Sequence, residues 1–195
     1  MKILVFQHDQ IEGLENIENI LKKNQISITF VKFYKKYIIP KNLKQFSMMI
    51  VLGGPMDTFM EDSYPWLKEE KTIIKKFVVD LQKPFLGICL GCQLLGEVLG
   101  GVINKSSVNE VGFCEVYSHN QIKKDNIFRD FPRNFKVFQL HSYEVTNIKS
   151  KDVEVLISSS STKYQLFRYK NNAYGMQFHL EILNETVKKW FSDKR

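Results

Sequence analysis

The sequence predicts an α/β fold built on a mostly parallel central sheet, with an antiparallel extension in the second half of the chain. The first observation is a continuous apolar run at residues 48–52, which is typical of a strand buried on both faces. The second is an alternation of strand and helix patterns up to about residue 100, the order expected of a doubly wound sheet. The third is a series of further strand patterns with little helix between them.

The first half of the chain alternates between the two patterns in order. Residues 3–6 form a short apolar run, typical of the opening strand of such a fold. Apolar residues then recur at helical spacing, at Leu14, Ile17, Ile20 and Leu21. The other elements expected here are strands at residues 26–33, 48–52 and 84–88 and helices at residues 64–80 and 91–99.

The second half of the chain lacks this alternation. Strand patterns follow one another at residues 111–117, 135–140, 153–158, 165–169 and 173–178. A last helix is expected at residues 182–191, carrying Trp190. No linker or internal repeat interrupts the patterns, so we expect residues 1–195 to form a single domain.

Composition excludes several classes of partner. The net charge of +7 comes almost entirely from dispersed lysines, which suits a solvated surface better than arginine-led reading of nucleic acid bases. No apolar run approaches the ~20 residues that span a bilayer. The start of the chain does not resemble a signal peptide, and three cysteines do not build a disulfide framework. We therefore expect a cytoplasmic protein that binds neither nucleic acid nor membrane.

The most informative stretch is Gly-Ile-Cys-Leu-Gly-Cys-Gln at residues 87–93. A buried strand runs directly into a helix through Gly-x-Cys-x-Gly, which is the nucleophile elbow with cysteine in place of serine. The sharp turn projects the side chain of Cys89 at a helix N-terminus, where the dipole favours a thiolate. The backbone N–H of Leu90 then points to where an oxyanion would form.

Other interpretations of these cysteines remain open. Cys89 could be a structural cysteine at a strand–helix junction. Cys92 completes a Cys-x-x-Cys with Cys89, which permits a thioredoxin-like dithiol, although we favour a small packed residue on the elbow helix. A zinc site lacks a second cysteine pair, and we expect neither a metal nor a cofactor.

A base and a carboxylate follow the last predicted strand. His179 and Glu181 are two residues apart, so in extended backbone they face the same side. A thiol nucleophile needs such a base, and the carboxylate would fix the tautomer of the imidazole. The alternative is a surface histidine beside a solvated glutamate. His8 ends the first strand, and a place at the rim of the site is its less favoured interpretation.

Gly53-Gly54-Pro55 ends another central strand. Ligands of open α/β sheets gather at the carboxyl ends of strands. A Gly-Gly turn lets a backbone N–H face the nucleophile without obstruction by a side chain. Gly54 is therefore a candidate for the second oxyanion donor, with a plain turn as the alternative.

Together, the Gly-Gly-Pro turn, the cysteine elbow and the Gln-Phe-His-Leu-Glu stretch at residues 177–181 resemble the class I, triad-type glutamine amidotransferases, over essentially the whole chain. The resemblance implies a three-layer α/β/α fold and hydrolysis of glutamine to glutamate and ammonia. It implies Cys89 as nucleophile, His179 as base and Glu181 as its orienter, with Gly54 and Leu90 as oxyanion donors.

The same resemblance implies substrate contacts. Gln93 matches a residue that contacts glutamine, and His141, Ser142 and Tyr143 fall where the family holds the α-amino and α-carboxyl groups, largely through backbone. Ser142 stands where glycine is frequent, and residues 179–181 read His-Leu-Glu where many members with synthetase partners read His-Pro-Glu. The chain is also similar to free-standing, GMP-synthase-like amidotransferases.

Three hypotheses of function follow. The first is glutamine amide hydrolysis; no ATP-pyrophosphatase pattern follows the amidotransferase motifs, so either a separate synthetase or acceptor subunit receives the ammonia or the chain acts alone. The second keeps the chemistry but cleaves γ-glutamyl peptides or conjugates. The third is a non-catalytic binding or regulatory module on the same fold.

Overall fold

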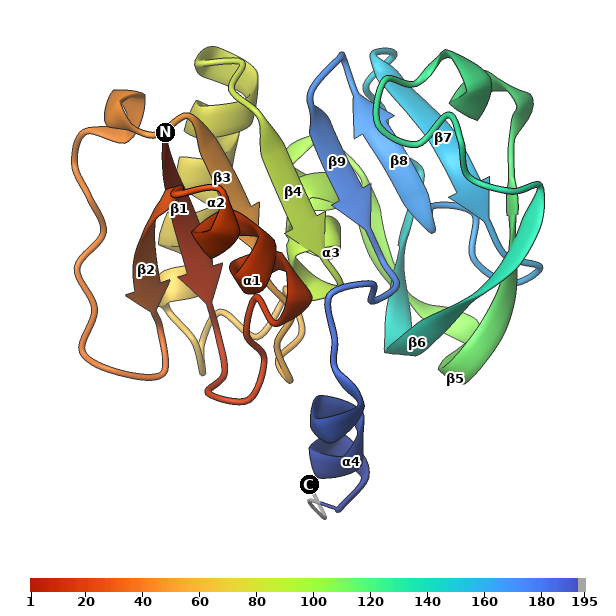
Figure 1. Ribbon diagram of the computed structural model, residues 1–195, viewed down its shortest axis with the longest axis horizontal. Coiled ribbons are helices and arrows are strands. Elements are labelled where there is room, and N and C mark those ends of the chain that lie inside the picture. Colours follow the sequence, from red (N-terminus) through yellow and green to blue (C-terminus); the bar gives the residue numbers. More distant parts are fainter. Residues whose placement is uncertain (193–195) are drawn as a thin grey trace.

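The computed structural model describes residues 1–192 and arranges them around a nine-stranded mixed sheet, with strand order β2-β1-β3-β4-β9-β8-β7-β5-β6 (Figure 1). The strands are β1 (Lys2–Gln7), β2 (Ser27–Lys32), β3 (Met48–Val51), β4 (Phe85–Ile88), β5 (Val102–Ser118), β6 (Asn134–Thr146), β7 (Val153–Ser158), β8 (Leu166–Tyr169) and β9 (Ala173–Met176). The α-helices are α1 (Asn16–Lys23), α2 (Trp66–Lys75), α3 (Leu90–Val98) and α4 (Asn184–Ser192). Shorter turns are the 3-10 helices η1 (Leu43–Gln45) and η3 (Asn120–Lys124) and the π-helical η2 (Lys76–Asp80).

The sheet has a parallel and an antiparallel half. β1 pairs in parallel with β2 and β3, β3 with β4, and β4 with β9. From β9 onward the pairs β9–β8, β8–β7, β7–β5 and β5–β6 are all antiparallel. The first-half strands β1 to β4 pair only in parallel, because the connections between them cross over the sheet, and β9 joins them from the second half of the chain. The predicted fold class, a mostly parallel sheet with an antiparallel extension, is confirmed.

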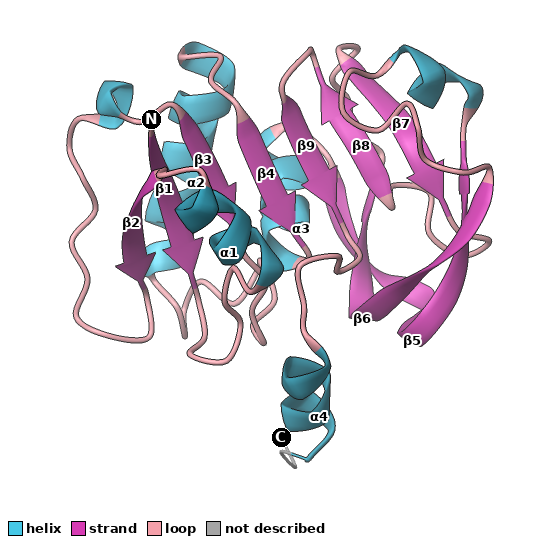
Figure 2. Ribbon diagram, viewed as in Figure 1, coloured by secondary structure: helices cyan, strands magenta, loops and turns pink. Residues whose placement is uncertain are grey.

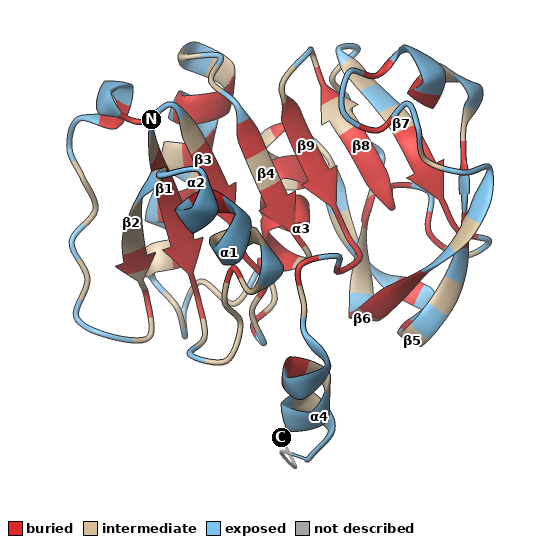
Figure 3. Cartoon of the chain, in the orientation of Figure 1, coloured by how far each residue is buried: buried red, intermediate tan, exposed pale blue. Residues whose placement is uncertain are grey.

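Helices cover both faces of the parallel half (Figure 2). α1 lies on one face, and α2 and α3 lie on the other. Successive residues of each buried strand contribute to the two faces in turn, so Ile3 and Val5 pack toward α1 whereas Leu4 and Phe6 pack on the opposite side. The central strands β1, β3, β4 and β9 are buried almost along their whole length, while the helices expose their outer faces (Figure 3). These are the three layers expected of an α/β/α fold.

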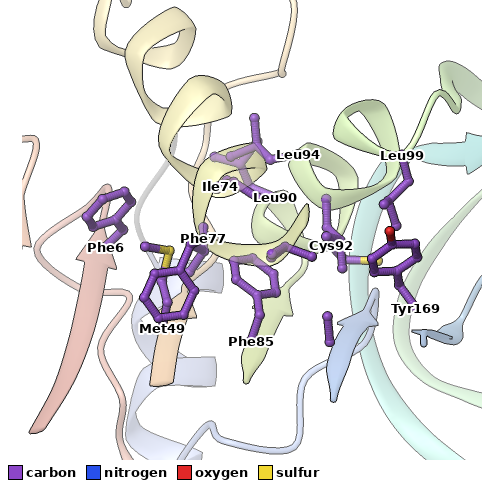
Figure 4. Close-up of a cluster of buried hydrophobic side chains, with 14 of the residues drawn as sticks. Phe6, Met49, Ile74, Phe77, Phe85, Leu90, Cys92, Leu94, Leu99 and Tyr169 are labelled. Carbon is purple, nitrogen blue, oxygen red and sulfur yellow. The ribbon is translucent and has the colours of Figure 1, made fainter. Parts of the chain in front are cut away.

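The core beneath α2 and α3 joins the two halves of the chain (Figure 4). Met49 and Phe85 from neighbouring strands pack against Phe77, and Cys92 lies in the same cluster, fully buried. Cys92 is therefore a small packed residue on α3, in agreement with the favoured interpretation. Burial raises the pKa of its thiol well above the usual value, with a further contribution from Cys89, so this sulfur is held as a neutral thiol.

Three boundaries differ from the sequence prediction in ways that affect the site. β5 and β6 are much longer than expected and form a two-stranded ribbon, in which residues 104–109 are mostly polar and exposed. Their pattern predicted no strand because little of the ribbon is buried. β6 also runs through His141, Ser142 and Tyr143, which therefore lie on a strand. β9 ends at Met176, before His179.

Among residues 1–192, no helix is long and apolar enough to cross a membrane.

Candidate active site

The strands β1, β3, β4 and β9 end at the same edge of the sheet (Figure 1). Residues that follow these strands line a cavity of about 440 Å³. The sequence-predicted residues that line it come from several separate parts of the chain: Gly54, Cys89, Leu90, Gln93, His141, Ser142, Tyr143 and His179. Glu181 is not part of the lining but contacts His179 from behind. The fold thus brings all nine predicted site residues together around one cavity.

Cys89 occupies a strained turn between β4 and α3. Its φ of 51° and ψ of −105° lie in a region that non-glycine residues rarely adopt. The backbone holds this turn through the N–H of Cys89, which donates to the carbonyl of Met176 at 2.8 Å, and through its carbonyl, which accepts from Gln93 N–H at 3.1 Å. The side chain is only partly buried and faces the cavity. This is the conformation expected of a nucleophile elbow.

The two glycines of the elbow permit a very close approach of backbones. A Cβ on Gly87 would lie 2.3 Å from the carbonyl oxygen of Gly91, and a Cβ on Gly91 would lie 2.2 Å from that of Val51. Backbone atoms of a sheet and a helix cannot easily move apart, so neither position tolerates a side chain. The two glycines of the Gly-x-Cys-x-Gly pattern are therefore required by the close packing of α3 on β3 and β4.

His179 and Glu181 form a buried pair. Nδ1 of His179 lies 2.7 Å from Oε1 of Glu181, and both side chains are almost fully buried. Burial by itself would lower the pKa of His179, but the Glu181 carboxylate and the Cys89 sulfur outweigh it and hold the pKa well above the usual value. The imidazole is thereby held by a carboxylate on one nitrogen and interacts with Cys89 on its other side.

The backbone around this pair is a bend and not the extended segment that the sequence predicted. His179 makes an isolated bridge with Phe138 of β6, in which its N–H donates to the Phe138 carbonyl at 2.9 Å. The carbonyl of Glu181 accepts from the N–H of Asn16 at the start of α1, at 3.0 Å. The ring of Trp190 in α4 packs edge-on against the imidazole, with centroids 5.1 Å apart. Tertiary contacts, more than strand periodicity, place the two side chains together.

A second buried histidine–glutamate pair lies behind the Gly-Gly-Pro turn. Nε2 of His8 lies 3.0 Å from Oε1 of Glu70 in α2, and both side chains are fully buried. Nδ1 of His8 lies 2.9 Å from the carbonyl oxygen of Gly53. The C=O and N–H of a peptide unit point in opposite directions. Holding the Gly53 carbonyl therefore fixes where the N–H of Gly54 points.

His8 is also fixed by its aromatic neighbours. Its ring stacks on Phe33 and Trp66, with interplanar angles of 5° and 18°. Burial would lower the pKa of His8, but Glu70 and the Gly53 carbonyl more than offset it, so the pKa is raised and the imidazolium is favoured. His8 thus supports the Gly-Gly-Pro turn from beneath. Glu70 was missed because nothing in sequence links two residues 62 positions apart.

Gln93 connects α3 to the ribbon. Its side-chain N–H groups donate to the carbonyl of Tyr143 at 3.0 Å and to Oε1 of Gln177 at 3.3 Å. The amide of Gln177 in turn lies 3.7 Å from the sulfur of Cys89. Gln177 was within the predicted motif but had no predicted role. The amide nitrogen of Gln93 is thus bonded within the protein. Because Gln93 lines the cavity, its amide oxygen is the side-chain atom that can accept a hydrogen bond from a ligand.

His141 belongs to a third buried pair. Its Nε2 lies 3.1 Å from Oε2 of Glu110 in β5, and its Nδ1 lies 3.1 Å from the carbonyl of Tyr143. Burial of Glu110 opposes ionisation, but hydrogen bonds from His141 and neighbouring hydroxyls lower its pKa to about 2. The His141 ring is therefore occupied within the protein. His141 and Ser142 both line the cavity.

Sequence reasoning missed several residues of the cavity wall, among them Glu12, Asp57 and Trp190. Glu12 and Asp57 lie in loops, where no periodic pattern marks them. Burial raises the pKa of Asp57 from its usual value. Within residues 1–192, no three histidine, cysteine or carboxylate side chains lie together in a way that could hold a metal ion.

The fold and the cavity together define an α/β protein with a cysteine on a nucleophile elbow and a histidine–carboxylate pair beside it. The family model for class I glutamine amidotransferases matches residues 9–194. The chain therefore belongs to the class I glutamine amidotransferase family, whose members are generally cysteine-dependent amidohydrolases.

Similarity to individual proteins points to the GMP-synthase-like members. The chain is 32% identical over 143 residues to one subunit of the glutamine-hydrolysing GMP synthase from Sulfolobus acidocaldarius, covering 73% of this chain and 71% of that protein. It is 30% identical to the GMP synthase of Wigglesworthia glossinidia brevipalpis over 76% of this chain, but spans only 27% of that longer protein. Among solved structures, a glutamine amidotransferase from Thermotoga maritima superposes with a TM-score of 0.89 at 30% identity, covering 98% of this chain and 81% of that one.

Proposed function

We propose that this chain hydrolyses the side-chain amide of glutamine to glutamate and ammonia, with Cys89 as nucleophile, His179 as base and Glu181 as the group that orients the base. The observation that carries the proposal is the joint geometry of the strained Cys89 turn and the 2.7 Å His179–Glu181 contact, both directed at one cavity. A cysteine that is strained, partly exposed and paired with a held imidazole has the features of an activated nucleophile.

The first half of the reaction forms a thioester. The proton of Cys89 passes to His179, and the sulfur attacks the amide carbon of glutamine. The C–N bond then breaks as the His179 imidazolium gives its proton to the leaving nitrogen, which departs as ammonia. The high pKa of His179 supports the thiolate–imidazolium form from which this attack begins.

The negative oxygen formed during attack needs hydrogen-bond donors. Leu90 is the first residue of α3, so its N–H has no acceptor within the helix. Gly54 supplies the second N–H, in an orientation maintained by the His8–Glu70 pair through the Gly53 carbonyl. Such preorganised donors are worth about 10²–10³ in rate.

The second half of the reaction releases glutamate. His179, now neutral, takes a proton from water as the water oxygen attacks the thioester carbon, and the proton returns to the sulfur as the C–S bond breaks. Gln93 and the backbone at His141, Ser142 and Tyr143 hold the α-amino and α-carboxyl groups of the glutamyl part.

The likeness to one subunit of a GMP synthase favours transfer of the ammonia to a separate synthetase or other acceptor subunit. Free thiols at Cys89, Cys92 and Cys114 favour a reducing, cytoplasmic setting.

The direct test is ammonia release from glutamine by the purified protein, compared with Cys89→Ala. Wild type should turn glutamine over, and Cys89→Ala should be inactive while keeping the same melting temperature within a few degrees. Cys114→Ala is the matched control, because it removes a thiol outside the cavity lining and should leave the rate unchanged. Full activity of Cys89→Ala would refute the assignment, and a folded but inert wild type would favour a non-catalytic binding module.

A second candidate keeps the same residues but cleaves larger γ-glutamyl conjugates. The volume of the cavity favours it, because about 440 Å³ is in the range of sites that hold drug-sized ligands. Turnover of γ-glutamyl dipeptides with no turnover of glutamine would replace the first proposal with this one.

A further inference from the structure

Glu12 lies in the loop between β1 and α1 and forms part of the cavity wall. The surroundings of Gly53 indicate how close the Glu12 carboxylate lies to the reacting groups. A Cβ built on Gly53 would lie 2.3 Å from Oε2 of Glu12 and 3.5 Å from both Cβ of Cys89 and Cε1 of His179. The carboxylate thus shares with the nucleophile and the base the small space that the absent side chain of Gly53 leaves open.

The carboxylate of Glu12 has no hydrogen-bond donor among the described residues, although a carboxylate can accept about four hydrogen bonds. The other three glutamates around the cavity are different, because Glu70, Glu110 and Glu181 each contact a histidine. Burial is the main cause that raises the pKa of Glu12 to about 7. His179 and His8 lower this pKa, whereas the carboxylates of Asp9 and Glu181 raise it further. A partly buried carboxylate that faces a cavity and has a raised pKa and no donor from the protein is a candidate for binding a ligand.

The charge of the cavity wall indicates the sign of that partner. The residues that line it include the carboxylates of Glu12 and Asp57 and no lysine or arginine, in a chain whose net charge is +7. Basic side chains are therefore abundant on this protein but absent from the lining that the structure describes. The imidazolium of His179 also lines the cavity, but its charge is paired with Glu181 and Cys89. The two carboxylates therefore favour a positively charged group here and repel a leaving group that carries a carboxylate.

The position of Glu12 indicates which part of the substrate it would meet. In the proposed mechanism His179 hands its proton to the leaving nitrogen, so that nitrogen must lie beside the imidazole. The α-amino group lies at the other end of the glutamyl chain, on the side of Gln93 and Ser142. Oε2 of Glu12 and Cε1 of His179 both lie close to the point where a Cβ of Gly53 would stand, so the carboxylate is near the base and, in this mechanism, near the leaving nitrogen.

We propose that Glu12 forms a subsite for a cationic leaving amine, so that the preferred substrates are γ-glutamyl amides of amines that carry a second, protonated amino group. This inference rests on the proposed function and names its substrate class. In these substrates the amide nitrogen leaves as a primary amine, protonated by His179, while the remote ammonium stays bound to the Glu12 carboxylate. The proton balance at the reaction centre is the same as for glutamine.

The test compares kcat/KM for glutamine and three amides that differ in the charge of the leaving group. Mono-γ-glutamyl ethylenediamine is cationic, γ-glutamyl propylamide is neutral and γ-glutamylglycine is anionic. Wild type should favour the cationic over the neutral amide by roughly tenfold or more, the scale of one charge-assisted hydrogen bond, with the anionic substrate lowest.

Variants of Glu12 separate charge from shape. Glu12→Gln should abolish the advantage of the cationic over the neutral amide, measured as the ratio of their kcat/KM values within that one variant. Glu12→Asp keeps the charge and should retain the ranking. Glu15→Gln is the matched control, because it removes a carboxylate from the same loop outside the cavity lining, and it should change nothing.

Two results would overturn the subsite. One is a wild type that does not favour the cationic over the neutral amide. The other is a Glu12→Gln variant that loses the same factor on every substrate, which would assign Glu12 to the shared glutamyl group. Failure of the proposed function looks different: no substrate, glutamine included, would be turned over, and the subsite would fall with it.

Discussion

Two of the buried histidine–glutamate pairs near the cavity have the same chemical partners but different connections. In the first pair, Nδ1 of His179 contacts Glu181, and no other protein group contacts that nitrogen in the part of the chain described. In the second, His8 uses Nε2 for Glu70 and Nδ1 for the Gly53 carbonyl. A histidine with one nitrogen directed at a thiol can move a proton, whereas a histidine with both nitrogens occupied can only hold its neighbours in place. The same pair of residue types thus serves as a base at one position and as a support at the other.

The largest difference between the pairs should follow removal of each imidazole. His179→Asn removes the base, so hydrolysis should fall by about 10³-fold or more. Steady-state ammonia release measures this, with melting temperature as the check on folding. A variant that is folded and keeps more than a tenth of wild-type activity would mean that His179 is not the base.

Glu181→Gln tests the orienting carboxylate, with an expected loss in kcat of about 10²-fold or more because the imidazole loses its fixed tautomer. It also removes the main attraction that raises the pKa of His179. The imidazolium is present below that pKa and lost above it, so a lower pKa moves the alkaline limb of the rate profile to lower pH.

A pH–rate profile of both proteins measures that shift. An alkaline limb that stays in place, or moves to higher pH, would show that Glu181 does not control the charge of His179.

His8→Asn tests the second pair, and its effect on rate should be smaller, about tenfold to a hundredfold in kcat, because the Gly54 N–H is misdirected and not lost. It should also cost about 3–5 kcal/mol in the free energy of unfolding, since Glu70 is left buried and unpaired. Glu70→Gln is the matched variant, which keeps a hydrogen bond to His8 and should cost less.

The rate at which iodoacetamide alkylates Cys89 distinguishes the supporting role of His8 from the role of His179 as a base. This reaction needs the thiolate but no oxyanion donors, so its rate should be nearly unchanged in His8→Asn and strongly reduced in His179→Asn. Equal loss of alkylation in both variants would remove the distinction between the pairs.

The smallest effect concerns Glu12, which interacts with both histidines but has no hydrogen-bond donor among residues 1–192. Its pKa is raised on folding from 4.5 to about 7, so its protonated form favours the folded state. That contribution is full below about pH 4.5 and is lost as the pH rises to about 7. Glu12→Gln should therefore be more stable relative to wild type at pH 8 than at pH 5, as measured by urea unfolding. A difference that does not change between the two pH values would contradict this.

The sequence predictions agree with the structure where a feature depends on residues that are close together in the chain. The elbow at Cys89 was predictable because Gly87 and Gly91 are fixed by backbone packing that leaves a local signature. The His179–Glu181 contact was predictable from two-residue spacing, although the backbone there is a bend held by contacts with distant residues. The parallel half of the sheet followed from its buried, continuous apolar strands.

The remainder depends on contacts between distant residues. Glu70 lies on a helix whose pattern only marks its packing face, so its pairing with His8 has no sequence signal. Glu12 lies in an irregular loop, and the exposed β5–β6 ribbon lacks the alternation that would mark a strand. The single-domain interpretation and the roles of the site residues stay predictions.

The most direct test of the catalytic assignment is covalent labelling by a chloroketone analogue of glutamine, followed by peptide mass spectrometry. The analogue must be bound by the glutamyl pocket and attacked by the nucleophile, so it reports on both. We expect one adduct per chain, on Cys89, blocked by glutamine and slowed in His179→Asn. A folded wild type that gains no adduct, or that is labelled on Cys92 or Cys114 instead, would contradict the account.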